Sequence, residues 1–218
     1  VELTKEQKKI YKELQDYALA ELENFDTVTT ASVITQILRL QQVVCGFVRS
    51  DQGQILEIPN NRMTELLSIF EESDSKCIIW ANYQYDIRKI ESEIAKVYGQ
   101  DSVASYYGET PPKERQDIVK RFQDPDSELR FFIGQPRTGG FGLTLTQGTT
   151  VIYYSNSYDL ETRLQSEDRA HRIGQENKVT YIDLCAYKTV DEKIIKSLRS
   201  KINMATQILG EDYRKWLL

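Results

Sequence analysis

Apolar positions follow two different patterns along the chain, and the change from one pattern to the other divides the chain into two regions. Over residues 4–24 and again over about 30–47, they recur every three or four residues, which predicts two amphipathic helices. Residues 51–54 predict a turn, and a further helix is expected over about 63–70. We therefore expect residues 1–58 to form a helical entry segment.

From residue 59 onward, short apolar runs alternate with helical patterns, which is typical of βαβ units around a parallel sheet. Near-continuous apolar runs suit strands that are covered on both faces. The strands are expected at 76–81, 102–107, 130–134, 150–155 and 179–185, with helices between them at about 83–97, 112–122 and 160–173. The prediction is an α/β domain over residues 59–186, a parallel sheet flanked by helices, followed by a closing helix over about 190–209 in a C-terminal segment, 187–218.

Composition narrows the class of protein. Hydrophobic residues make up 40% and charged residues 28% of the 218 residues, a balance typical of a soluble globular protein with one main core. No apolar run approaches the roughly 20 residues that span a bilayer, so no membrane partner is expected. The chain begins at Val1 without a basic-then-apolar leader or an initiator Met, which suggests an intracellular piece of a longer polypeptide. The net charge of -5 predicts that any nucleic-acid contact is a local groove.

Cysteine and histidine usage gives no sign of a metal site. Cys45, Cys77 and Cys185 are far apart in the sequence and stand in apolar company. There is no Cys-x-x-Cys pair, and His171 is the single histidine. We interpret the cysteines as reduced core residues and predict no metal ligands.

Two segments carry candidate chemistry, and the first is rich in glycine. Gly139, Gly140 and Gly142 follow the third predicted strand, where ligands bind in open α/β sheets. Such a turn can offer backbone amides to a phosphate. A plain turn is an equally good interpretation, and no Walker A lysine follows.

The second segment, residues 165–175, contains two arginines on a predicted helix. Gln165, Arg169 and Arg172 stand at spacings of four and three and are expected to project from one helix face. Arginine serves phosphoryl transfer as a planar, permanently charged donor. For a generic pair of arginines, a solvated helix with an Asp168–Arg172 pair is the favoured interpretation. The choice between this and a phosphoryl-transfer site therefore depends on the surrounding sequence.

The order of motifs resembles the C-terminal lobe of the SNF2 family of superfamily 2 helicase-like motors. The segment 168–175, Asp-Arg-Ala-His-Arg-Ile-Gly-Gln, is close to a signature of that family, its motif VI. Other segments resemble further elements of the family in the right order: 38–45, 77–83 (motif IV), 107–110, 138–145 (motif V) and 189–194.

The resemblance implies a RecA-like (P-loop NTPase-type) fold for residues 59–186 and a C-terminal brace helix within 187–218. It also implies a role as the second lobe of an ATP-dependent DNA translocase. ATP and Mg²⁺ would be held mainly by the N-terminal RecA-like lobe of the same polypeptide, whose P-loop is absent here, so this chain alone is expected to be inactive. Arg169 and Arg172 would act as arginine fingers, with Gln165 and Gly142 beside the nucleotide.

The same resemblance implies contacts with the backbone of double-stranded DNA. The residues that would make them are Asn82, Tyr83, Gly108, Thr110, Arg137, Thr138, Gly139 and Gly140. The family usually carries small hydroxyl residues at Gln135-Pro136, alanine at Thr138 and asparagine at Thr144, so this chain departs from it around the glycine turn. Residues 153–158 look more like bacterial or phage members, which would make the protein cytoplasmic or nucleoid-associated. The alternative is a non-enzymatic α/β nucleotide- or protein-binding module that kept the fold.

Overall fold

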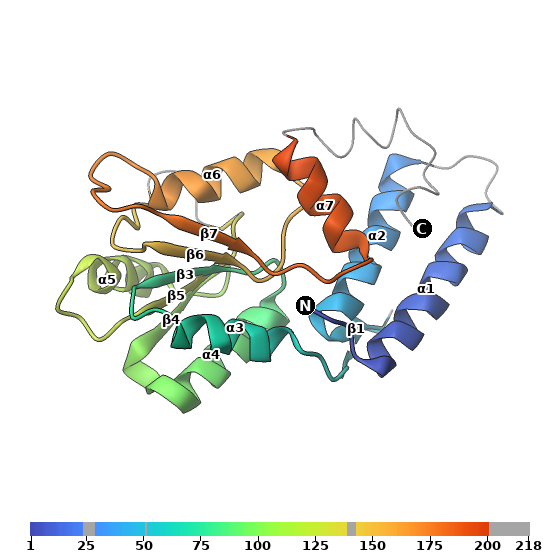
Figure 1. Ribbon diagram of the computed structural model, residues 1–218, viewed down its shortest axis with the longest axis horizontal. Coiled ribbons are helices and arrows are strands. Elements are labelled where there is room, and N and C mark those ends of the chain that lie inside the picture. The colour runs from blue at the N-terminus through green and yellow to red at the C-terminus, as the bar shows by residue number, and fades with distance from the viewer. Residues whose placement is uncertain (24–28, 51, 139–142, 201–218) are drawn as a thin grey trace. The chain divides into compact units, whose positions relative to one another are not determined.

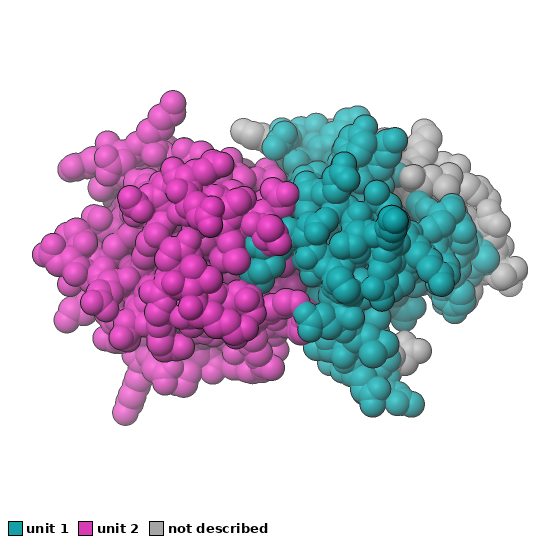
Figure 2. All heavy atoms as spheres, turned by 60° about the horizontal axis from the view of Figure 1, so that its bottom comes forward, with its two compact units in different colours: residues 1–63, 185–218 teal, residues 64–184 magenta. Residues whose placement is uncertain are grey.

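The computed structural model describes residues 1–23, 29–50, 52–138 and 143–200. It divides into two compact units, residues 1–63 with 185–218 and residues 64–184 (Figure 2). The sequence boundaries expected after residues 58 and 186 stay predictions. No described helix is long and apolar enough to cross a membrane.

The first unit is helical. It contains α1 (Lys5–Glu23), α2 (Thr30–Cys45) and α7 (Val190–Arg199), together with an antiparallel hairpin of β1 (Phe47–Arg49) and β2 (Ile55–Glu57). At the start of α1, the Gln7 backbone amide donates to Thr4 Oγ1 (3.1 Å) and the Thr4 amide donates to Gln7 Oε1 (3.0 Å), which is a capping box. Gly46 ends α2 at φ +93°, where a Cβ would stand 1.8 Å from Asn60 Nδ2. A side chain is therefore excluded at this position both by the left-handed backbone conformation and by the closeness of Asn60.

A buried polar cluster fixes α7 within this unit. Arg62 pairs with the carboxylate of Asp191, and both side chains are almost fully buried. The Ala186 amide donates to the same carboxylate (3.2 Å), and the Val190 amide donates to the hydroxyl of Tyr11 (2.9 Å). Burial raises the pKa of Tyr11 above its usual range, so that the hydroxyl stays protonated. The predicted closing helix is confirmed as far as Arg199, and residues 201–218 lie outside the described residues.

The second unit is built on a five-stranded parallel sheet in the order β4-β5-β3-β6-β7 (Figure 1). The strands are β3 (Cys77–Trp80), β4 (Val103–Tyr106), β5 (Phe131–Gly134), β6 (Thr150–Tyr153) and β7 (Thr180–Asp183). All five predicted strands are confirmed, and the fold is the RecA-like α/β sheet that the resemblance implied. The helices are α3 (Arg62–Glu71), α4 (Gln84–Tyr98), α5 (Pro112–Gln123) and α6 (Leu160–Ala170), with a short 3₁₀ turn, η1 (Gln100–Ser102).

The two faces of the sheet are covered by different helices. Figure 1 shows α6 on one side of the sheet and α3 with α4 on the other. Strand alternation sends Ile78, Trp80 and Phe132 to the side of α5 and α6, where they pack with Phe122 and Ala170. On the opposite face, Phe131 contacts Phe70 of α3 and Tyr98 of α4. Gly134 leaves room for an indole ring, because a Cβ there would lie 2.5 Å from Trp80.

Two expectations were wrong or incomplete. The helix expected over 160–173 ends at Ala170, so Arg172 lies in the following turn. The hairpin of β1 and β2 was not predicted beyond its turn at 51–54. Its strands have three residues each and β2 is exposed throughout, so neither produces an alternating pattern.

The three cysteines are free thiols, with Cys45 and Cys77 buried and Cys185 half-buried. Burial raises the pKa of Cys77 to about 11, which keeps it in the neutral form. Across the described ranges, no group of three His, Cys, Asp or Glu side chains could hold a metal ion.

Candidate functional site

The predicted site residues fall at two opposite ends of the parallel sheet. Because every strand pairs in parallel, all loops that follow strands meet at one end, the carboxyl end, and all loops that precede strands meet at the other, the amino end. The connection from β5 to β6, residues 135–149, runs from the carboxyl end back to the amino end. The two ends are separated by about 13 Å, the length of a four-residue strand.

Polar contacts join three loops at the carboxyl end. The Asn82 amide donates to Ser155 Oγ (2.8 Å), which links the loops after β3 and β6. Gln135 Nε2 donates to the Asn82 carbonyl (3.0 Å), and Thr138 Oγ1 donates to Gln135 Oε1 (3.0 Å). The structure therefore brings Asn82 and Thr138, both predicted, onto one surface. Gln135 and Ser155, which connect them, were not predicted, because a polar residue after a strand carries no signal of its partner.

Thr110 has a structural role in the loop after β4. Its hydroxyl donates to the Ser105 carbonyl (2.9 Å) and accepts from the Tyr107 amide (3.1 Å), and the residue is only 7% exposed. Arg115 donates to the carbonyls of Thr110 (2.9 Å) and Gly108 (3.2 Å). The threonine side chain is thus committed to shaping the turn, which presents the exposed Gly108.

Two exposed arginines and the start of a helix lie at the carboxyl end. The Arg137 side chain is 60% exposed, lies 3.9 Å from Asp159 Oδ2 and rests over the Tyr158 ring. Arg88 donates to Glu109 (2.6 Å), and hydrogen bonds with Tyr107 and then Glu109 raise its pKa. Tyr83 begins α4 without a side-chain cap. The amides in the first turn of such a helix carry a partial positive charge that attracts anions.

A buried ion cluster fastens α6 to the sheet. The Arg163 guanidinium lies 3.5 Å over the ring of Tyr153 on β6, and it pairs with Glu167 (2.6 Å) and with Asp183 of β7 (2.5 Å). Ser166 contacts the Tyr153 hydroxyl (2.7 Å). These contacts fix the rotation of α6, which decides where the residues at its C-terminal end lie.

Arg169 and Arg172 both lie at the amino end of the sheet. Arg169 is in the last turn of α6, its side chain largely covered (9% exposed), and its carbonyl accepts from the Leu145 amide (2.9 Å). Arg172 is exposed and follows the helix; its Nη1 donates to Thr144 Oγ1 (3.2 Å) and to the Leu143 carbonyl (3.4 Å). The prediction that Arg169 and Arg172 project from one helix face is wrong, because α6 ends at Ala170 and His171 is its C-cap.

Neither arginine is neutralised by a carboxylate within the described part of the chain. The alternative Asp168–Arg172 pair does not form among those residues, since Arg172 turns toward the β5–β6 connection. Gln165 is exposed on α6 and donates to Glu161 (3.0 Å), one helical turn before Arg169. Gly139, Gly140 and Gly142 lie outside the described residues.

Gln175 was not predicted as a site residue, yet its side chain makes several hydrogen bonds at the amino end. Its Nε2 donates to the carbonyls of Thr146 (2.8 Å) and Ala170 (3.1 Å) and reaches that of Gly148 (3.5 Å). Its Oε1 accepts from the Asn177 amide (2.9 Å). A motif places this glutamine next to the arginines in sequence but does not show which carbonyls it meets.

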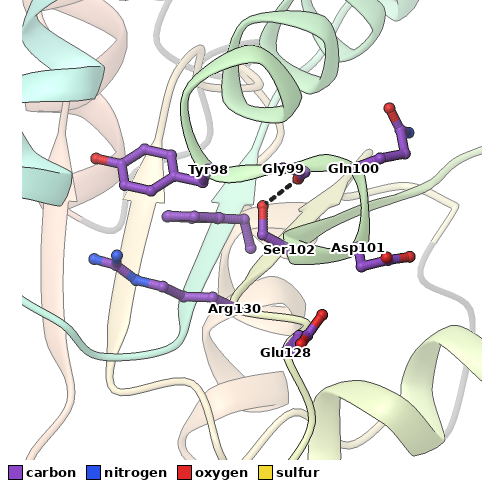
Figure 3. A pocket seen from close by; sticks show the side chains of 8 residues that line it. Tyr98, Gly99, Gln100, Asp101, Ser102, Glu128 and Arg130 are labelled. Atoms are coloured by element: carbon purple, nitrogen blue, oxygen red, sulfur yellow. Dashed lines mark hydrogen bonds between the residues drawn. The ribbon is translucent and has the colours of Figure 1, made fainter.

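A separate groove of about 450 Å³ opens where β4 and β5 begin (Figure 3). None of the predicted residues lines it, and its walls come from Tyr98, Gly99, Gln100, Asp101, Ser102, Glu128, Arg130 and Phe131. Arg130 donates to the carbonyls of Phe70 (2.9 Å), Ser73 and Ser75 (3.3 Å). Its guanidinium therefore ties the end of α3 to β5.

Comparison with known proteins places the chain in a family. The Helicase conserved C-terminal domain family matches residues 60–174, slightly more than half of the chain. An uncharacterized ATP-dependent helicase of Mycoplasma pneumoniae is 27% identical over 214 residues, which are 97% of this chain and 20% of that protein. The human SWI/SNF-related matrix-associated actin-dependent regulator of chromatin subfamily A member 1 is 29% identical over 151 residues, 69% of this chain and 12% of that protein.

Solved structures agree with these sequence matches. The Sulfolobus solfataricus SWI2/SNF2 ATPase core in complex with dsDNA is 25% identical with a TM-score of 0.73, over 98% of this chain and 45% of that one. The C-terminal domain of the same ATPase, at 23% identity, shares the fold with a TM-score of 0.68 over 98% of this chain and 88% of that one. The chain therefore spans about a fifth or less of the length of these two curated relatives and less than half of the solved core.

Proposed function

The chain belongs to the helicase conserved C-terminal domain family as the C-terminal lobe of an SNF2-type ATPase, and from this premise we propose that it is the second motor lobe of an ATP-dependent DNA translocase. Its amino end serves ATP held by a first lobe of the same polypeptide, and its carboxyl end grips the backbone of double-stranded DNA. The chain by itself does not hydrolyse ATP.

The contacts of the exposed Arg172 side chain are the observation that carries the proposal. Its guanidinium is exposed, and within the part of the chain that the structure describes it donates only to a carbonyl and a hydroxyl, which are neutral acceptors. A guanidinium held in this way keeps its full charge and can exchange weak partners for phosphate oxygens. Charge that develops on a transferred phosphoryl group is stabilised by such a donor. Arg169 is the second candidate, because it lies in the last turn of the adjoining helix.

The donor groups at the amino end suit the phosphates of ATP and not the metal. Arg169 and Arg172 supply hydrogen-bond donors, whereas Mg²⁺ prefers oxygen ligands from carboxylates and phosphates. We therefore assign the Mg²⁺ ligands to the first lobe. When bound, MgATP supplies the phosphoanhydride bond that is hydrolysed, and this lobe contributes positive charge beside it.

The carboxyl end has the features of a surface that binds a DNA backbone without reading sequence. Exposed Gly108 and the amides at the start of α4 suit phosphate contacts, and Arg137 adds an exposed charge. Contacts of this kind position a protein on DNA but carry no sequence information. The Sulfolobus solfataricus relative, solved with dsDNA, supports this assignment.

The test uses the full-length protein, with ATP turnover measured with and without DNA. Arg172→Ala and Arg169→Ala should each lower DNA-stimulated turnover by about 10³ or more, the effect of losing an arginine finger. Arg49→Ala, an exposed arginine on the β1–β2 hairpin, is the matched control and should leave turnover unchanged. Near-wild-type turnover in both finger variants would reject the motor assignment.

A further inference from the structure

One glutamine joins three segments around the exposed arginine at the amino end. We propose that Gln175 is a positioning residue for Arg172: it clasps the loop 143–148 against the end of α6, and that loop in turn holds the Arg172 guanidinium. The inference rests on the proposed role of Arg172 in ATP turnover. It concerns a residue that touches no phosphate itself.

The hydrogen bonds of Gln175 are all internal. The two N–H groups of its amide face three carbonyls, those of Thr146, Ala170 and Gly148, at 2.8, 3.1 and 3.5 Å. Its oxygen accepts from the Asn177 amide. A side-chain amide has two N–H donors, and both face carbonyls of the chain, so this side chain has no donor left for a phosphate oxygen.

The loop that Gln175 holds is the same loop that holds Arg172. Thr144 Oγ1 and the Leu143 carbonyl accept from the Arg172 guanidinium. The Leu145 amide donates to the Arg169 carbonyl, and the Gly148 amide donates to the Leu145 carbonyl (3.0 Å). Residues 143–148 and 169–175 therefore form a closed ring of contacts, with Gln175 on one side and Arg172 on the other.

The sheet fixes this ring in space at Gly148. A Cβ at this glycine would lie 2.6 Å from Ile78 Cδ1, so the loop passes directly over β3. The turn itself is closed by the backbone N–H of Gln175, which donates to the Arg172 carbonyl (2.9 Å). With the loop seated on the sheet and the turn tied to the loop, the position of the Arg172 side chain is set by Gln175. Removing the side-chain hydrogen bonds of Gln175 keeps the arginine and its charge but frees the turn that positions it.

The first residues of the loop, 143–145, belong to the segment that resembles motif V, and the turn belongs to motif VI. Family members usually carry asparagine at Thr144, and here the threonine hydroxyl is one of the two acceptors for Arg172. Arg172 therefore joins the two motifs, and Gln175 holds the residues that directly follow motif V. A group that fixes a charge near a reacting phosphoryl affects the transition state more than the binding of ATP.

The experiment is a double-mutant cycle in the full-length protein, with ATP turnover measured at saturating DNA. Gln175→Met keeps the length of the side chain and removes its hydrogen bonds. Displacing a catalytic group by about 1 Å costs roughly 10²-fold, so we expect kcat to fall by about that factor with KM changed less than threefold. In the Arg172→Ala background, Gln175→Met should cost less than threefold, because the group it positions is gone. Gln147→Met, the same substitution at an exposed position of the same loop, is the control and should have no effect.

Each outcome supports or overturns the proposal. A merely structural glutamine would lower turnover by the same factor in both backgrounds, and that additivity would overturn positioning while leaving the role of Arg172 intact. Unchanged turnover in Gln175→Met would also overturn the positioning role and leave the role of Arg172 intact. If Arg172→Ala itself retained near-wild-type turnover, the proposed function would fail first, and the positioning role with it. Should Gln175→Met fail to fold, Gln175→Glu, which keeps the acceptor for Asn177, replaces it in the same cycle.

Discussion

The two ends of the parallel sheet carry the same kinds of groups but hold them differently. At the carboxyl end, three loops are joined by polar contacts through Asn82 and Gln135, while Arg137 and Gly108 stay exposed around them. At the amino end, a ring of hydrogen bonds through Gln175 holds one arginine, Arg172, in a defined place. A DNA backbone repeats and needs many tolerant contacts, whereas one phosphoryl group needs one charge in one position. The difference agrees with the proposed division of tasks, in which the carboxyl end binds DNA and the amino end serves ATP.

The largest expected effect separates the two ends by function. In the full-length protein, Arg172→Ala should reduce DNA-stimulated turnover by about 10³ and leave DNA affinity unchanged, because the lost charge acts on ATP alone. Turnover assays and DNA binding at one fixed salt concentration check this. Loss of DNA affinity in the same variant would mean that the two ends are not functionally distinct.

The next largest effect is expected at the ion cluster around Arg163, which fixes α6 against the sheet. Arg163→Met should destabilise the chain by about 3 kcal/mol, because it removes the cation that pairs with the buried carboxylate of Asp183. Urea denaturation of the 218-residue chain measures this. Arg88→Met, which removes an exposed pair with Glu109, is the matched control and should not change the midpoint. Equal midpoints for both variants would show that the Arg163 cluster does not anchor the helix.

A smaller, pH-dependent effect is expected at Cys77, the first residue of β3 at the amino end. Burial raises the pKa of this thiol to about 11 from an ordinary 9.0. The unfolded chain therefore loses the proton first, and the contribution of this group to stability is present below pH 9 and declines between pH 9 and 11. At one pKa unit per 1.4 kcal/mol, the loss is at most about 3 kcal/mol.

Comparison with Cys77→Ala isolates this contribution. The wild-type chain should be more stable than Cys77→Ala at pH 8, since the buried side chain fills its site, and the advantage should shrink at pH 10.5. Chemical denaturation at the two pH values measures both differences. An advantage that stays constant or grows with pH would contradict the assigned pKa shift.

The smallest effect belongs to the carboxyl end. Arg137→Ala should weaken DNA binding about threefold and lower the salt dependence of affinity by about one counterion, because one phosphate contact is removed among several. Turnover at saturating DNA should stay at the wild-type value. Binding titrations at several salt concentrations provide the check, and an unaltered salt slope would exclude Arg137 from the phosphate contacts.

The sequence predicted more of the sheet than of the site. Strands buried on both faces, such as Phe131–Gly134, are recognised by their continuous apolar runs. The edge strand Thr180–Asp183, which is more exposed, was found as well. The end of α6 was missed by three residues, because Arg172 and Ile173 fit a helical pattern while the chain there turns into Gly174 at φ +99°. The hairpin after α2 was missed because exposed three-residue strands have no periodicity to read.

Within the site, sequence spacing identified the arginines but not what holds them. The contacts of Arg172 with Thr144 and of Gln175 with Thr146 join residues 28 and 29 positions apart. Such contacts depend on how the β5–β6 connection crosses the sheet, which no local pattern encodes. Gln135, which connects Asn82 and Thr138, was overlooked for the same reason.

The central claim is that Arg172 adds its charge to the phosphoryl group during hydrolysis. The most direct test compares the affinity of the full-length protein for ADP with that for ADP and aluminium fluoride, a mimic of the phosphoryl in transfer, in wild type and in Arg172→Ala. The account predicts a loss of about 10³ for the mimic and less than threefold for ADP alone. Equal losses for the two ligands, or an unchanged affinity for the mimic, would contradict it.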